Sequence, residues 1–581
     1  MMSQLRTLRR VLLLGLGLLS ACAAADPGSD PVYFDPAAGA HAHGGFTGIY
    51  GSYLLGRFAD SESDPDMAAR AFLRTLQADP TDHEVLQNAF IATLLSDRPE
   101  AESLARQLPE NQEAQLLLGG IEARAGQWTE AEQRFRAMPR QGLTQLLQPL
   151  LLAWAEQGGG HTDTALATLR PLVEGQRFRG IYALHAALIA DQAGRVPEAT
   201  RFYRIAENEF SATNLRLTQI LASWLTRQGH AADAERGLSA LSDGQDELSL
   251  VVPALVAAGR NPPVANPTQG IAEAYLALGA ALRQQDASDY ALIMLNLALN
   301  LRPDLSAARL LMADIHDVAH QPQAALDALA PIPDSDPLSG IVRLHRAQLQ
   351  QRLDHTDQAI DALSALARDY PKNPLPDVQM GDILRGKKRF QAAIAAYDGA
   401  VAKLKGPRRS GWPLFYSRGI AHEQAHEWPE AEADLQRALA LAPDQPYVLN
   451  YLGYTWADQG IRLPEARRMI ERALEQTPND GAIVDSLGWI MIRQGQTAEA
   501  VPMLERAVGL QSEDATINQH LGDAYWAVGR RLEAVFQWRR ALTLNPEPED
   551  QAALEKKLRD ADSQLAQPGP VSTTAAAQHA P

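Results

Sequence analysis

The sequence has little of what enzymes with cysteine chemistry, disulfide-bonded proteins or nucleic-acid-binding proteins need. It contains one cysteine, Cys22, in 581 residues, so no disulfide within the chain supports the fold. Its formal net charge is −17, which argues against nucleic acid as a partner because that binding requires a basic surface. Aromatic residues make up 6% of the chain, while Ala and Leu dominate, as expected of stacked helices. The motifs G-x-S-x-G and C-x-x-C are absent, and so is a cysteine nucleophile beyond the N-terminal segment.

The N-terminal 21 residues have the pattern of a signal peptide. Three arginines precede the apolar run from Val11 to Leu19, which is too short to span a bilayer, and we find no other candidate span. The run leads into L-S-A-C, which resembles the bacterial lipobox, and the resemblance implies that Cys22 is acylated and becomes the new N-terminus. Two or three acyl chains anchor a protein durably. Ala23 follows the cysteine in place of aspartate, which by resemblance to enterobacterial lipoproteins implies the outer membrane.

Small residues recur at a fixed interval through the rest of the chain. In its second half they are Gly279, Ala313, Ala347, Gly381, Gly419, Gly453, Gly488 and Gly522. An alanine follows each of the last three after 12 or 13 residues, and a proline or serine ends each of these units. Antiparallel helices pack closely only where the crossing residues are small, and proline ends a helix. A period of about 34 residues is typical of tetratricopeptide (TPR) arrays. We therefore predict an all-α fold, a TPR α-solenoid in which about 14 helix hairpins form a right-handed superhelix.

The first half carries a looser copy of the same repeat, and the two halves are separated by a break. Glycines seven residues after each small position, such as Gly126 and Gly160, suit the left-handed backbone of a turn between helices. The break contains the proline-rich stretch AAGRNPPVANPTQG, which favours a joint between two solenoid segments. The predicted order is a signal peptide (1–21), a flexible tether (22–45), a degenerate N-terminal array (46–240), a proline-rich joint (241–270), a regular C-terminal array (271–546), a capping helix (547–566) and a disordered tail (567–581).

One segment matches a catalytic motif. His422, Glu423 and His426 fit H-E-x-x-H, which on a helix places both histidines on one face to hold zinc while the glutamate activates water. The repeat frame runs through this segment undisturbed, however, and His422 occupies a column that packs between helices. We therefore predict no enzyme activity and no cofactor, and keep a zinc peptidase as an alternative.

The first helix of each repeat lines the concave face of a TPR array, so its residues are the candidates for binding a partner. The inward columns of the last three repeats contain Asn450, Tyr454, Asp485, Trp489, Gln519, Asp523 and Trp526. Aromatic and amide groups beside carboxylates predict a site for an extended or helical peptide. The alternative is that Trp489 and Trp526 only cover the surface of the superhelix.

The combination of features resembles a proteobacterial family of TPR lipoproteins. It consists of the lipobox, the loose N-terminal array, the proline-rich joint and the terminal run VLNYLGYTWADQG…DGAIVDSLGWIMIRQGQ…LGDAYWAVGRRLEA. Some members of this layout are outer-membrane adaptors that gather a carboxyl-terminal processing protease and its cell-wall hydrolase clients. The resemblance implies a periplasm-facing outer-membrane lipoprotein that binds periplasmic proteins or peptides. A TPR component of envelope assembly or polysaccharide export is the alternative.

Overall fold

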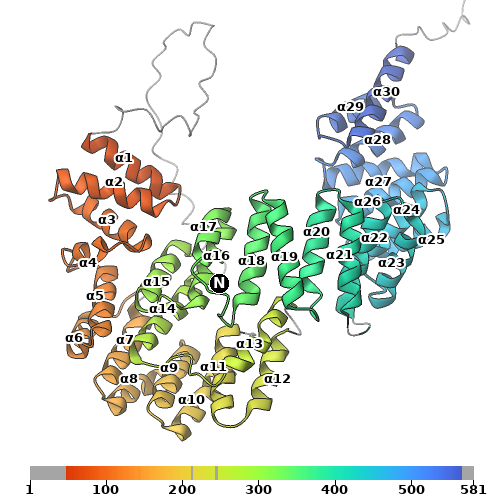
Figure 1. Cartoon of the computed structure of the whole chain (residues 1–581). Helices are drawn as coiled ribbons and strands as arrows, with labels where there is room; N and C mark the ends of the chain where they lie inside the picture. Colours follow the sequence, from red (N-terminus) through yellow and green to blue (C-terminus); the bar gives the residue numbers. More distant parts are fainter. Residues whose placement is uncertain are drawn as a thin grey trace, which may run out of the picture. The chain divides into compact units, whose positions relative to one another are not determined.

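The computed structural model describes residues 48–142, 144–210, 214–242, 246–404, 406 and 409–565. The predicted signal peptide, the lipidation site Cys22, the predicted tether and the predicted tail lie outside these residues. Every element in the described part of the chain is helical, without strands, which confirms the predicted fold class (Figure 1). No helix there has the length and apolar character that a membrane span requires.

The chain forms two compact units, one ending at Leu104 and the other beginning at Ala105. The helices of the first unit are α1 (Ile49–Ser61), α2 (Pro65–Ala78), α3 (His83–Leu95) and the short α4 (Glu100–Ala105), whose last residue starts the second unit. Helices α1 and α2 cross where Gly56 faces the ring of Phe72. A Cβ atom at Gly56 would lie 2.7 Å from that ring, so the expected small residue is required by the packing.

The second unit begins with four hairpins. They are α5 (Gln112–Arg124) with α6 (Trp128–Ala137), α7 (Thr144–Gly158) with α8 (Thr162–Glu174), α9 (Arg179–Gln192) with α10 (Val196–Glu209), and α11 (Leu215–Arg227) with α12 (Ala231–Ser242). The predicted joint is more ordered than a linker, because it forms the 3-10 helix η2 (Asp246–Leu250) and helix α13 (Val252–Ala258).

Eight further hairpins and one single helix follow. The hairpins are α14 (Pro267–Arg283) with α15 (Ser288–Leu301), α16 (Ser306–Val318) with α17 (Pro322–Leu329), α18 (Ser339–Arg352) with α19 (Thr356–Asp369), α20 (Leu375–Gly386) with α21 (Phe390–Ala402), α22 (Trp412–Gln424) with α23 (Trp428–Leu441), α24 (Pro446–Asp458) with α25 (Leu463–Gln476), α26 (Gly481–Arg493) with α27 (Thr497–Leu510), and α28 (Ala515–Ala527) with α29 (Arg531–Leu542). Helix α22 is preceded by the one-turn η3 (Arg409–Gly411), and α30 (Pro548–Leu565) packs on α29 at the predicted position of the cap.

Two local features make each hairpin. The small residue of the first helix meets the core side chain of the second, as at Gly522, where a Cβ atom would lie 2.5 Å from Trp538. The turn between the helices contains one residue with left-handed backbone, as predicted for Gly126 and Gly160, whose φ angles are +76° and +83°. Glycine takes this conformation without a steric cost. His426 occupies the same turn position with φ +62°.

Helix α14 joins the two halves of the second unit. It is the first helix of its own hairpin, yet it also packs on α5, α7 and α9 (Figure 1). Gly270 of α14 lies against the indole of Trp154 in α7, where a Cβ atom would be only 2.2 Å from the ring. The hydroxyl of Tyr275 donates to the carbonyl oxygen of Leu116 in α5 at 2.9 Å. Helix α14, which begins within the predicted joint, therefore packs back on hairpins that precede the joint.

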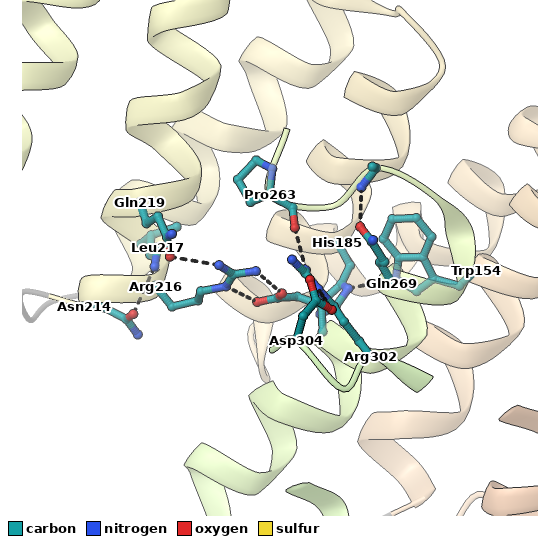
Figure 2. A network of polar contacts seen from close by, with 12 residues as sticks. Trp154, His185, Asn214, Arg216, Leu217, Gln219, Pro263, Gln269, Arg302 and Asp304 are labelled. Atoms are coloured by element: carbon teal, nitrogen blue, oxygen red, sulfur yellow. Dashed lines mark hydrogen bonds and ion pairs between the residues drawn. The ribbon is translucent and has the colours of Figure 1, made fainter. Parts of the chain in front are cut away.

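A buried polar network fixes this contact (Figure 2). Arg216 of α11 donates two hydrogen bonds, of 2.9 and 2.6 Å, to the carboxylate of Glu273 in α14. The indole N–H of Trp154 donates to Nδ1 of His185 in α9 at 2.9 Å. Burial raises the pKa of Glu273, but the charge and hydrogen bonds of Arg216 outweigh it, so its net pKa is lowered. Burial lowers the pKa of His185 to about 4. The network therefore holds one charged pair and one neutral imidazole inside the unit.

Candidate functional site

Two sets of first helices in the second unit offer surfaces for a partner, and their environments differ. The first set, α5, α7 and α9, is contacted by α14 of the same chain. The second set, α22, α24 and α26, packs on its own hairpin partners and on neighbouring helices of the same series. Among the described residues, no helix from elsewhere in the chain packs on α24 or α26 as α14 packs on α7. The second set is therefore the candidate site.

Three tyrosines lie along one side of α24. Tyr447, Tyr451 and Tyr454 are spaced four and three residues apart, which places them on one face of a helix. Tyr447 is 50% exposed, and the other two are half-buried. The opposite side of α24 carries residues of the hydrophobic core, such as Val448 and Leu452. Tyr451 also packs against the edge of this core, whereas Tyr447 is left exposed at the start of the helix.

Aromatic contacts extend this side of α24 to the neighbouring helices. The ring of Tyr416 in α22 lies edge-on to Tyr451 at 5.8 Å between centroids, and Trp412 lies 5.9 Å from Tyr416. On the other side, the Tyr454 ring lies 6.3 Å from the imidazole of His520 in α28. We call this surface the tyrosine face; its residues are Tyr416 of α22, Tyr447, Tyr451 and Tyr454 of α24, and Trp489 of α26.

His520 connects three of the residues predicted from the sequence. Its ring stacks on Trp489 at 4.2 Å and 12° between planes, and its Nδ1 lies 2.8 Å from Oδ2 of Asp485. Burial lowers the pKa of His520, but the charge and hydrogen bond of Asp485 and the charge of Asp523 outweigh it, so the net pKa is raised. His520 and Asp485 are both about 4% exposed. This pair holds the Trp489 ring in place.

The other predicted residues have different environments. The carboxylate of Asp523 accepts hydrogen bonds from the indole of Trp538 and from Lys557 of α30, at 2.8 and 2.7 Å, so it joins the cap to the array. Trp526 packs on Trp538 at 5.3 Å and is partly buried in the core beneath α30. Trp526 therefore contacts the core between the last hairpin and α30.

Three of the residues predicted to bind a partner carry buried polar atoms without a hydrogen-bond partner among the described residues. Within the described chain, Oδ1 of Asn450, Oδ1 of Asp485 and the indole nitrogen of Trp489 are buried and accept or donate no hydrogen bond. An unpaired buried polar group costs about 1–3 kcal/mol.

Carboxylates surround the centre of this face. Burial raises the pKa of the Tyr454 hydroxyl, and four carboxylates raise it further, those of Asp458, Asp485, Asp550 and Glu423. They come from α24, α26, α30 and α22. These carboxylates therefore oppose the deprotonation of the Tyr454 hydroxyl.

A hollow of about 270 Å³ lies at the start of α28 and of α30. Gln519, the remaining predicted residue, lines it together with Asp550. Three further carboxylates line the hollow, those of Glu513, Asp514 and Glu547, and no lysine or arginine does.

The H-E-x-x-H segment does not form the face that zinc binding needs. Helix α22 ends at Gln424, and His426 lies in the following left-handed turn, so the two histidines do not share a helix face. Nδ1 of His422 lies 2.7 Å from Glu427, and Glu423 accepts a hydrogen bond from Tyr451 at 3.0 Å. The described residues contain no group of three or more His, Cys, Asp or Glu side chains that could hold a metal ion.

Sequence reasoning missed part of the tyrosine face. Tyr447 and Tyr451 have the helical spacing of a shared face with Tyr454, a signal that was available in the sequence. His520 gave no such signal, because the same position in the preceding repeats holds residues of different chemistry, namely Gln379, Ser417, Tyr451 and Ser486. The packing of α14 on α7 had none either, because Gly270 lies outside the repeat frame.

Comparison with known proteins identifies the repeat. A family model of the tetratricopeptide repeat matches residues 98–142, 416–481 and 486–547, and a second one matches residues 342–373. The residues in these four stretches match the tetratricopeptide repeat. No curated protein sequence matches the chain significantly.

Solved structures that resemble the chain are distant. A tetratricopeptide repeat protein from Parabacteroides merdae shares 14% identity, with a TM-score of 0.37, over 44% of this chain and 97% of its own. The APC/C assembly Cut9–Hcn1 shares 16%, with a TM-score of 0.36, over 88% and 95%. Yeast Tom70 shares 12%, with a TM-score of 0.33, over 89% and 96%.

Proposed function

We propose that the protein is a non-catalytic scaffold that binds protein partners on the tyrosine face of its C-terminal repeats. The observation that carries this proposal is the difference between the two sets of first helices. Helix α14 packs on α5, α7 and α9, whereas no described helix outside the C-terminal repeats packs in this way on α24, which keeps Tyr447 50% exposed and Tyr451 and Tyr454 partly exposed. Aromatic residues are enriched at the centres of protein interfaces because each removes a large apolar area from water.

The cellular setting of this proposal comes from the sequence. The lipobox-like L-S-A-C places a lipid on Cys22, and the tether lets the repeats reach into the periplasm from the outer membrane. Within that setting we propose an adaptor role, in which the scaffold brings a carboxyl-terminal processing protease to its clients. This finer role rests on the resemblance to TPR lipoproteins.

Affinity capture with the full-length, membrane-tethered protein tests the scaffold. We expect mass spectrometry to recover defined envelope proteins, a processing protease among them, and a Tyr447→Glu variant to lose them. Tyr290 is a matched control position, because it is 51% exposed but lies on the second helix α15. Capture that Tyr447→Glu and Tyr290→Glu leave equally intact would contradict the proposed face. Recovery of a polysaccharide export or envelope assembly complex in place of a protease would contradict the adaptor role alone.

Membrane fractionation tests the anchor separately. We expect Cys22→Ala to release the protein from membranes into the soluble fraction, because the acyl chains are then lost. Continued sedimentation of Cys22→Ala with the outer membrane after a high-salt wash would show that the attachment does not depend on this cysteine.

A further inference from the structure

The charge around the tyrosine face is one-sided. Glu423, Asp458, Asp485 and Asp550 act on the Tyr454 hydroxyl, and three more carboxylates line the adjoining hollow. Three basic residues beside these groups already have protein acceptors. Arg493 donates to the carbonyl oxygens of Ala457 and Asp458, Lys557 pairs with Asp523, and Lys388 pairs with Glu547 of the hollow at 2.7 Å. The negative charge of this surface is therefore only partly neutralised by the protein's own side chains.

One carboxylate in this group lacks a partner although it is buried. Asp485 is 4% exposed, its Oδ2 lies 2.8 Å from His520, and its Oδ1 has no hydrogen-bond partner in the described chain. A buried carboxylate normally has its oxygens satisfied. This unpaired oxygen is an observation independent of the number of acidic residues, and it leaves part of the negative charge beneath the tyrosine face without a hydrogen-bond donor of the described chain.

The aromatic rings suit the same kind of ligand. The faces of tyrosine and tryptophan rings attract ammonium and guanidinium groups. The guanidinium of Arg493 already lies 5.9 Å from the centre of the Trp489 ring. The half-exposed rings of Tyr447 and Tyr451 have no such cation over them among the described residues.

The spread of the carboxylates decides between a metal ion and a peptide. A metal ion requires several ligand atoms within about 2.0–2.6 Å of one point. No three acidic, histidine or cysteine side chains of the described residues come together in that way. The carboxylates around Tyr454 come instead from four different helices. An extended segment with several positive side chains can satisfy separated carboxylates at once.

We propose that the tyrosine face binds a basic segment of a protein partner, with lysine or arginine side chains seated against its rings and the surrounding carboxylates. This inference rests on the proposed scaffold function and names the chemistry of the partner. The apolar contact of the rings with the partner contributes a part of the affinity that does not depend on salt concentration. The carboxylates add selectivity for positive charge and faster association.

The test uses the full mature chain carrying Cys22→Ala and three fluorescent peptides of equal length, one rich in lysine and arginine, one neutral and one rich in glutamate. We expect the basic peptide to bind most tightly, with an affinity that falls as salt is raised. The variant Asp458→Asn/Asp550→Asn should weaken the basic peptide about three- to thirtyfold, since each exposed charge contributes modestly. Tyr447→Ser should weaken it about two- to fivefold.

The matched control is Glu475→Gln/Glu499→Gln. It removes the same charge from exposed positions on the second helices α25 and α27, and we expect a change below about twofold. Circular dichroism of each variant confirms that it is folded.

The outcomes separate this inference from the scaffold function. Equal loss of the basic peptide in the Asp458/Asp550 variant and in the control variant would show a non-specific charge effect and overturn the inference. Tighter binding of the neutral or acidic peptide, still weakened by Tyr447→Ser, would keep the tyrosine face as the scaffold's site but overturn its selectivity for basic segments. Absence of binding by all three peptides would overturn the inference, while the affinity capture decides the scaffold function independently.

Discussion

The contact of α14 with the preceding hairpins predicts a large effect of one substitution, Glu273→Leu. Glu273 is 4% exposed at its side chain, and Arg216, its partner, is 17% exposed. Removing one member of a buried ion pair costs about 3–5 kcal/mol, because the remaining charge is left without a partner. Arg216 keeps some access to water, so we expect the lower end of that range, about 3 kcal/mol. Replacing both residues by Leu and Met leaves no unpaired charge, and we expect that double variant to recover most of the loss.

Hydrogen exchange measured helix by helix is the suitable assay, because a repeat array does not unfold in one step. We expect Glu273→Leu to speed exchange in α14, α5 and α7 about a hundredfold, the equivalent of about 3 kcal/mol. Exchange in α24 should stay unchanged. Asp354→Asn is the control, since it removes an exposed ion pair with Lys387 and should cost less than about 1 kcal/mol. A Glu273→Leu effect as small as that of the control, or an equal effect in α24, would refute this account of the contact.

Three further predictions concern pH, packing and metal. Burial lowers the pKa of His185 to about 4, so below the ordinary histidine pKa the unfolded chain binds more protons than the folded chain. Denaturation should therefore show that the free energy of unfolding falls by about 2 kcal/mol between pH 7 and pH 5, and that His185→Asn abolishes this fall. An unchanged pH dependence in that variant would contradict the prediction. Gly522→Ala should lower stability by about 1–3 kcal/mol through contact with Trp538, whereas Gly237→Ala, with open space around it, should raise stability by about 0.5–1 kcal/mol; the same sign for both in thermal unfolding would disprove the packing argument. Because His426 lies in a left-handed turn, zinc measured after dialysis should be well below one equivalent, and stoichiometric zinc that His426→Ala removes would revive the peptidase alternative.

The repeat could be predicted from the sequence because its cause is local. A small residue is needed wherever two helices cross, so Gly453, Gly488 and Gly522 mark the first helices directly. The turn residues follow the same logic, with glycine at most of the left-handed positions of the first half. Both features recur along the array, and the described residues form 13 such hairpins, close to the predicted number of about 14.

The contacts between distant parts of the chain were not predictable from that pattern. Gly270 is not one of the regularly spaced small residues. Its small size leaves room for the ring of Trp154, which lies in a hairpin more than one hundred residues earlier. The stretch around it was therefore predicted to be a joint, since its prolines are the only local signal. At the candidate site, the repeat pattern predicted Asp485 and Trp489. It did not predict His520, which stacks on Trp489 and lies beside Tyr454.

Site-specific photo-crosslinking in living cells tests the central claim most directly, because it asks which surface a partner contacts. A benzophenone amino acid replaces Tyr447 in one variant and Tyr290 in another. The two tyrosines have nearly equal exposure, 50% and 51%, but Tyr447 lies on a first helix and Tyr290 on a second helix. The account predicts defined protein adducts from position 447 and none from position 290. Adducts from position 290 alone would contradict the claim that partners bind the tyrosine face.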